Sequence, residues 1–309
     1  MNRVHLRRRA AAGAVLLALA TALVLGVRGC GDPAPLRARA APTPTPRPAQ
    51  LPGGGRHIFP GRRVVAFYGN PADDQLGVLG IGSPRRAARR LLRQARAYER
   101  PSRKVLPAME LLADVANADP GDDGRYRRQE TAAVIGRYLR AARRVDALLV
   151  LDLQPGRASF LPEARRLRRW LREPDVGLAL DPEWHVAAPD VPGRVIGSVD
   201  GADVEAVATW LDKLTERARL PQKLFVVHQF TDSMVARKEL LRPHRNLAVV
   251  LNTDGFGSAP VKVAKYREFT RQAPWTFDGF KLFYHEDLGL MTPAEVLHLR
   301  PAPDVIVYE

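Results

Sequence analysis

From Val64 onward, short apolar runs alternate with longer segments rich in arginine and alanine. The runs have the length of buried strands, and the longer segments have the apolar spacing of amphipathic helices. The expected strands lie at 64–69, 105–110, 147–152, 176–181, 194–199, 224–230, 247–252 and 279–287. Eight strand-to-helix units in roughly 245 residues predict an α/β fold, a (β/α)8 TIM barrel.

The helices expected between these strands carry recognisable start signals. Ser83 followed by Pro84 is typical of a helix N-terminus, and Thr292 with Glu295 forms a capping-box pattern. The expected helices cover 83–98, 129–144, 162–172, 203–217, 233–241 and 261–272, with a last one beginning at Thr292.

One further apolar run, 304–309, does not fit a count of eight. Either it covers the barrel from outside, or one of the eight expected strands is not a strand. The run at 105–110 is the weakest of them because Pro107 cannot donate to a ladder. A doubly wound open sheet is the alternative fold, although no Gly-x-Gly-x-x-Gly motif follows the first run.

Two of the runs, LLVLDLQPG and VGLALDPEWH, end in an aspartate followed by turn-forming residues. In the second, Val176, Leu178 and Leu180 share one parity and face the helices. Gly177, Ala179, Asp181 and Glu183 share the other parity and face inward. Acids at the C-terminal ends of parallel strands lie at the edge where barrel enzymes carry out their chemistry.

Asp181 and Glu183 are the first candidates for catalysis. If the strand continues through Pro182, their Cα atoms lie about 6 to 7 Å apart on one face. Two carboxylates in one cleft push their pKa values apart, so that one serves as general acid while the other stays ionised, as glycosidic bond cleavage requires. Trp184 offers a ring on which a sugar can stack. The structural alternative is that Asp181 caps a loop and Glu183 is solvated.

Other polar residues gather at the same ends of the runs. Asp152 and Asp254 are further catalytic candidates, as nucleophile or water activator, and Gly255 and Gly257 allow a close loop beside Asp254. The expected substrate-binding residues are Tyr68, Asn70, Gln154, Trp184, His228, Asn252, Lys281 and Asp287. Polar residues at one end of so many strands favour a binding site there.

A metal site is the rival chemistry, with Asp152, Asp181, His185 and His228 as acceptable ligands. No His-x-His, His-Glu-x-x-His or cysteine pair supports it, and no Gly-x-Ser-x-Gly motif supports a serine nucleophile. No metal or other cofactor is therefore expected.

The net charge of +15 is concentrated near the N-terminus, where residues 1–63 hold eleven arginines and one acid. The rest of the chain carries only +5, which argues against nucleic acid as a partner. Arg7, Arg8 and Arg9 precede an apolar stretch over 10–27, the pattern of an export signal or membrane anchor whose basic end stays inside. A membrane tether and an exported domain are expected, with cleavage and retention both open.

The only cysteine, Cys30, follows that stretch. It is either a lipidated cysteine of the lipoprotein kind or a residue that happens to follow an anchor. The next segment is rich in proline and glycine and suits a spacer. The expected organisation is a signal peptide or anchor over 1–30, a linker over 31–60 and a monomeric barrel domain over 61–309.

The runs LDLQPG, LALDPEWH, PGRVIGSVD, KLFVVHQF and GFKLFYHED resemble those of exported, often lipoprotein-like actinobacterial proteins related to the TIM-barrel glycosidase superfamily. The Asp-x-Glu of Asp181 and Glu183 is also similar to that of family 25 lysozymes and chitinase-type barrels. Where family 25 lysozymes have an aspartate on the first strand, this chain has Tyr68 and Asn70, so the resemblance implies architecture and not the substrate.

Together these patterns predict an extracytoplasmic glycoside hydrolase that acts on cell-wall polysaccharide, peptidoglycan or extracellular polysaccharide. Glu183 is the expected general acid and Asp181 its orienting neighbour. Two alternatives remain: a non-catalytic glycan-binding or envelope scaffold protein that uses Trp184, Tyr68 and Phe256, and a metal-dependent hydrolase.

Overall fold

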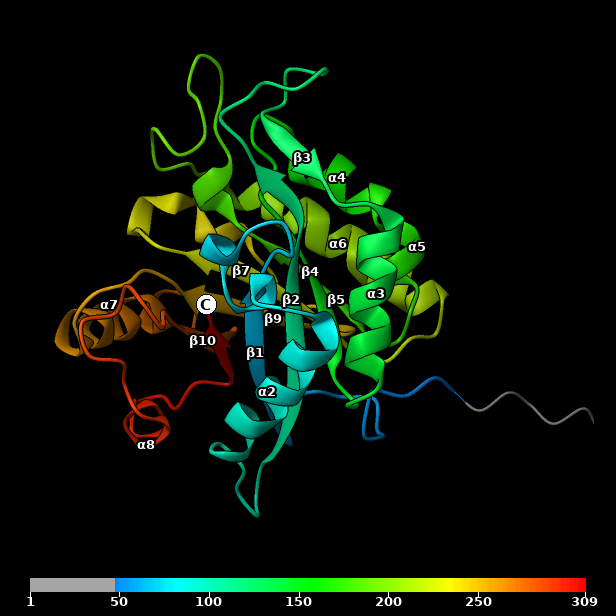
Figure 1. The fold of residues 1–309 in the computed structure, drawn as a ribbon, viewed down its shortest axis with the longest axis vertical. Coiled ribbons are helices and arrows are strands. Elements are labelled where there is room, and N and C mark those ends of the chain that lie inside the picture. Colours follow the sequence, from blue (N-terminus) through cyan, green and yellow to red (C-terminus); the bar gives the residue numbers. More distant parts are fainter. Residues whose placement is uncertain (1–47) are drawn as a thin grey trace, which may run out of the picture. The chain divides into compact units, whose positions relative to one another are not determined.

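The computed structural model describes residues 48–309 (Figure 1). The expected export signal or anchor, Cys30 and most of the expected linker lie outside the described residues. Within 48–309, none of the helices combines the length and the apolar character needed to cross a bilayer.

Eight parallel strands close into a barrel. Each strand pairs with the next around the ring, and β1 pairs with both β11 and β2, which closes the circle. In ring order the strands are β1 (Arg62–Gly69), β2 (Lys104–Ala116), β4 (Leu148–Leu153), β5 (Val176–Leu180), β7 (Lys223–Gln229), β9 (Leu247–Thr253), β10 (Phe277–Leu282) and β11 (Val305–Tyr308). This architecture is consistent with the predicted (β/α)8 fold.

Helices lie between most successive strands and surround them (Figure 1). They are α2 (Pro84–Arg96), α3 (Ala132–Arg143), α4 (Phe160–Arg166), α5 (Arg168–Leu171), α6 (Gly201–Arg217), α7 (Ala259–Gln272) and α8 (Pro293–Leu297). The start signals behave as expected: the Ser83 hydroxyl accepts from the Arg86 N–H, and Thr292 with Glu295 forms a complete capping box.

The structure corrects the expected strand count. Of the fifth expected strand, only Val199 lies in a strand, the short β6 (Val199–Asp200), whose partner is β8 (Val235–Ala236) outside the barrel. The run at 304–309 supplies the missing strand, β11. The strand containing Pro107 belongs to the barrel, and Pro107 is in register with Val65 of β1. On the other side β2 pairs with β4 only from Ala108 onward, so this side of Pro107 is unpaired, and proline is tolerated there.

The prediction of a helix over 233–241 was wrong. This stretch consists of two short 3-10 helices, Asp232–Met234 and Lys238–Leu240, separated by β8 and by Arg237 in the left-handed region at φ 51°. A left-handed residue interrupts a right-handed helix. A short strand, β3 (Arg127–Gln129), also adds antiparallel to β2 outside the ring.

The strands bury two separate cores. The larger one lies between strands and helices and includes Val176, Leu178 and Leu180, the outward parity that the sequence predicted for β5. The smaller one fills the barrel and includes Ala179. A side chain at Gly177 would collide with the Leu224 carbonyl, so this inward position requires glycine.

The N-terminal end of the barrel is covered by residues that had been assigned to the linker. Leu51, Ile58 and Phe59 are buried with the inner core, and the Phe59 ring lies 4.4 Å from that of Phe277. The compact unit therefore begins before residue 61, near Pro48. With this end covered, the C-terminal ends of the strands are left for a site.

Candidate active site

The inward-facing residues change from apolar to polar toward the C-terminal end of most barrel strands. Val64 and Ala66 are followed on β1 by Tyr68, and Leu148 and Val150 on β4 by Asp152. The inward polar residues that result are Tyr68, Glu110, Asp152, Asp181, His228, Asn252 and Lys281, all buried. The closed barrel brings them together because the strands are parallel and their C-terminal ends meet at one mouth.

A cavity of about 420 Å³ opens at this mouth. Seven predicted site residues line it: Tyr68, Gln154, Asp181, Glu183, Trp184, Asp254 and Lys281. Sequence reasoning did not assign Phe230, Phe283 and Glu309, which also line it, and it proposed Phe256 only for glycan binding. A larger cavity of about 800 Å³ shares Gln75, Glu286 and Glu309 with the first, so the two adjoin.

Glu183 faces this cavity from an element that the sequence did not predict. The strand ends at Leu180, and Pro182–Trp184 forms a short 3-10 helix, so the expected continuation of the strand through Pro182 was wrong. Proline suits the first position of such a turn. Burial, then the negative charges of Asp181 and Asp254, raise the pKa of Glu183 to about 7.

Asp181 lies beside Glu183 in a polar cluster. Its Oδ2 accepts hydrogen bonds from the Tyr68 hydroxyl at 3.3 Å and the Gln154 amide at 3.2 Å, and Gln154 also donates to the Tyr68 oxygen at 3.1 Å. Burial raises the pKa of Asp181 above its ordinary value, although nearby His228 and Lys281 oppose the shift. Two strand ends, those of β1 and β4, thereby fix the orientation of this carboxylate.

Asp254 has the opposite environment. Its Oδ2 lies 3.1 Å from Lys281 Nζ and 3.0 Å from His228 Nδ1, and its Oδ1 accepts from the Gly255 N–H at 2.7 Å. Burial alone would raise the pKa of Asp254, but Lys281 and His228 lower it well below its ordinary value. Lys281 also lies 2.6 Å from Glu309 and 3.8 Å from the centre of the Tyr68 ring.

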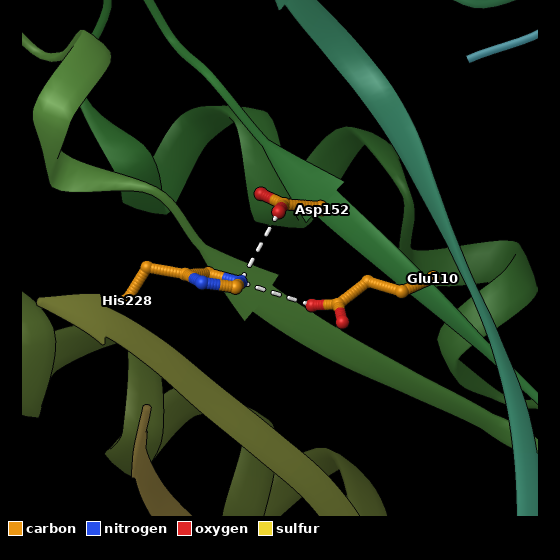
Figure 2. A group of neighbouring side chains, drawn as sticks. All are labelled: Glu110, Asp152 and His228. Carbon is orange, nitrogen blue, oxygen red and sulfur yellow. Dashed lines mark hydrogen bonds and ion pairs between the residues drawn. The ribbon is translucent and has the colours of Figure 1, made fainter. Parts of the chain in front are cut away.

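His228 connects the cavity to a deeper layer of the barrel. Its Nε2 lies 3.0 Å from Glu110 Oε1 and 3.4 Å from Asp152 Oδ2. Figure 2 shows the three side chains, from β7, β2 and β4, pointing toward one another. None of the three lines the cavity. Together they form a group with the spacing of metal ligands.

This group differs from the four metal ligands that the sequence suggested, Asp152, Asp181, His185 and His228. Asp152 and His228 do meet, but Asp181 bonds Tyr68 and Gln154, and His185 Nδ1 lies 2.6 Å from the Ser198 carbonyl. Glu110 was missed because its strand was doubted, although its inward parity with Leu106 and Ala108 was visible.

The remaining predicted site residues lie away from the cavity lining. Asn252 is buried beside His228, with its amide nitrogen 3.2 Å from the ring. Asn70 holds a turn by donating to the Leu112 carbonyl and to Glu130. Asp287 pairs with Lys262 at 2.8 Å and accepts from the Gly257 N–H, which fixes the loop after β9.

In the comparisons with known proteins, no protein-family model and no curated protein matches this chain. The function must therefore be argued from the site itself.

Proposed function

We propose that the protein is an extracytoplasmic glycoside hydrolase that acts on cell-wall or extracellular polysaccharide. Glu183 acts as general acid on the glycosidic oxygen. Asp254, held by Lys281, faces the positive charge that develops at the sugar, as nucleophile or as activator of water. Asp181 orients the reacting groups through its contacts with Tyr68 and Gln154.

The observation that carries this proposal is the cavity itself. A protonatable carboxyl, Glu183, and a carboxylate paired with a lysine, Asp254, line one space of about 420 Å³. Carboxyl groups in such different environments are the arrangement that glycosidic cleavage needs. Asp152, also expected as a catalytic candidate, does not line this space, so we assign it no step.

The walls of the cavity suit a carbohydrate. Tyr68, Trp184, Phe230, Phe256 and Phe283 all contribute to its lining, and the Phe256 side chain is 59 % exposed. Aromatic rings stack against the apolar faces of sugars, while the acids and Lys281 offer partners for hydroxyl groups. The adjoining larger cavity gives room for further sugar units of a polymer.

The extracytoplasmic location rests on the N-terminal sequence. Three consecutive arginines precede the apolar stretch over 10–27, a pattern that directs the following domain across the membrane. The proline-rich linker would then place the barrel near the cell wall.

The test is Glu183→Gln assayed on two glycosides of the same sugar. With a poor leaving group, turnover should fall about 10²- to 10⁴-fold, because the leaving oxygen then lacks its proton donor. With an activated aryl leaving group, which departs without a proton, the loss should be much smaller. Glu216→Gln, an exposed change on α6, is the matched control and should leave both rates unchanged.

Equal activity of Glu183→Gln and wild type on the poor leaving group would refute the role of Glu183. Binding of peptidoglycan or polysaccharide without any release of reducing ends, in wild type, would favour the glycan-binding alternative. In that case binding should depend on Trp184, Tyr68 and Phe256 and survive the loss of Glu183.

A further inference from the structure

We propose that Glu110, Asp152 and His228 bind one divalent first-row transition-metal ion, Zn²⁺ or Mn²⁺, beneath the floor of the cavity. The proposal concerns the deeper layer of the barrel and does not depend on the glycosidase assignment.

The spacing of the three ligand atoms fits a single ion. All three lie within 4.8 Å of one another, with His228 Nε2 at 3.0 Å from Glu110 and 3.4 Å from Asp152. An ion about 2.0 to 2.2 Å from each ligand would hold neighbouring ligand atoms about 3.0 to 3.5 Å apart, whether tetrahedral or octahedral. The two distances from His228 Nε2 already match this spacing.

Asp152 points independently to a missing ligand. Its side chain is fully buried, and within residues 48–309 neither of its oxygens accepts a hydrogen bond. Its ion-pair contact is His228 Nε2 at 3.4 Å, a nitrogen that lies closer to Glu110. A buried carboxylate that lacks hydrogen bonds is destabilising, and such groups in folded proteins are usually paired or coordinate a metal. Asp152 Oδ2 faces His228 Nε2 across the group (Figure 2), where an ion would satisfy it.

The second ring nitrogen of His228 is arranged as in known metal sites. Nδ1 lies 3.0 Å from Asp254 Oδ2, which is placed to accept a hydrogen bond from it. When an ion is bound, this contact suits the tautomer that donates from Nδ1 to Asp254 and directs the lone pair of Nε2 toward Glu110 and Asp152. Ligating histidines usually donate their other N–H to a carboxylate or carbonyl in this way.

The supporting scaffold is rigid, and the ligand types select the metal. The three ligands project from β2, β7 and β4, strands of the closed barrel, which hold ligands more firmly than loops do. One imidazole and two carboxylates suit Zn²⁺ or Mn²⁺. Calcium needs six to eight oxygen ligands, more than this group supplies.

The charges of the barrel mouth also favour a bound cation. Six acids surround this region: Glu110, Asp152, Asp181, Glu183, Asp254 and Glu309. Lys281 contacts two of these acids, Asp254 and Glu309, as a cation. A divalent ion at the buried end would offset part of this excess.

The experiment measures metal binding by the full-length protein. The protein is stripped with a chelator, dialysed and titrated with ZnCl₂ or MnCl₂. We expect one ion per chain at micromolar concentration or tighter and a thermal midpoint higher by several degrees. Binding of CoCl₂ should produce visible absorption bands that report nitrogen and oxygen ligation.

Variants locate the ion. Asp152→Asn and Glu110→Gln should weaken affinity more than about 100-fold, because losing even a hydrogen-bond partner of a ligand can cost 10- to 100-fold. Asp181→Asn is the matched control. Asp181 is also a buried carboxylate, and it follows the neighbouring strand β5 but does not belong to the group of three ligands. This variant should still bind one ion, with an affinity within about 10-fold of that of wild type.

The absence of any stoichiometric ion in wild type would overturn the proposal, and so would binding that Asp152→Asn leaves unchanged. If the variants fail to fold, anomalous diffraction from wild-type crystals soaked in MnCl₂ or ZnCl₂ decides. A peak bonded to Glu110, Asp152 and His228 supports the site, and a peak elsewhere or none refutes it. None of these measurements uses glycosidase activity, so this proposal and the proposed function can fail separately.

Discussion

The two halves of the barrel interior are built on the same strands and differ sharply in chemistry. Near the N-terminal ends the inward residues are apolar, among them Val64, Ala108, Val150, Leu224 and Val250. One or two inward positions further along the same strands, the residues are Tyr68, Glu110, Asp152, His228 and Asn252. The transition takes place within about 7 Å along each strand, the rise of two residues.

This difference separates stability from function. The apolar half is stabilised by burial from water, a contribution that does not depend on pH. In the polar half, each buried charge needs an oppositely charged or hydrogen-bonding neighbour, because an unpaired buried charge lowers the stability of the fold. A protein keeps such a costly cluster where chemistry or binding needs it.

The largest effect should come from Lys281→Met in the polar half. Lys281 contacts both Asp254 and Glu309, so its loss removes the positive charge beside one buried and one partly buried carboxylate. We expect the free energy of unfolding to fall by about 3 to 5 kcal/mol at neutral pH. The loss should shrink at acidic pH, where the carboxylates take up protons. Urea unfolding at pH 5 and pH 8 measures both.

Lys213→Met, an exposed change on α6, is the control for Lys281→Met and should alter stability by less than about 0.5 kcal/mol. If Lys281→Met lowers the free energy of unfolding equally at the two pH values, the side chain stabilises the fold through packing. The polar half would then be stabilised in the same way as the apolar half.

Leu224→Ala probes the apolar half. Leu224 is buried against Gly177 inside the barrel. The change removes buried methyl groups and leaves a cavity, so we expect a loss of about 3 kcal/mol in the free energy of unfolding. The same urea titrations should give the same loss at pH 5 and pH 8. A strong pH dependence would show that the two halves are coupled.

Much of this arrangement could be predicted because side chains alternate between the two faces of a strand, and this alternation can be seen in a short stretch of sequence. The parity of Val176 to Asp181 placed Asp181 inside the barrel, and the apolar runs indicated the number of strands to within one. Runs followed by polar residues likewise pointed to Tyr68, Gln154, Asp254 and Lys281, which line one cavity.

What could not be predicted depends on pairings between distant residues. The choice between 194–199 and 304–309 as a barrel strand is decided by β11 pairing with β1, which lies more than 200 residues earlier in the chain. Glu110 was missed for a related reason. Pro107 argues against a central strand, and only the late start of pairing with β4 makes it acceptable. Because the strand that carries Glu110 was in doubt, the contact between Glu110 and His228 Nε2 could not be predicted.

The smallest of the three effects on stability should come from Glu183, which lines the cavity and is only partly buried. Its pKa is about 7 in the folded protein against an ordinary 4.5. Burial raises this pKa most, then Asp181, Asp254 and Glu309, and Lys281 opposes them. Lys265 also interacts with Glu183. As the pH rises from 4.5 to 7, the unfolded chain releases this proton before the folded protein does, so the contribution of Glu183 to stability falls.

Glu183→Gln removes this titration. The free energy of unfolding of the variant should therefore rise relative to that of wild type between pH 4.5 and pH 7, by on the order of 2 kcal/mol, and stay level above that range. Turnover by wild type should fall as the pH rises through about 7, because the general acid loses its proton. A stability difference that is flat from pH 4.5 to pH 7 would show that Glu183 titrates as an ordinary surface acid. The protonated donor that the proposed cleavage needs would then be absent at neutral pH.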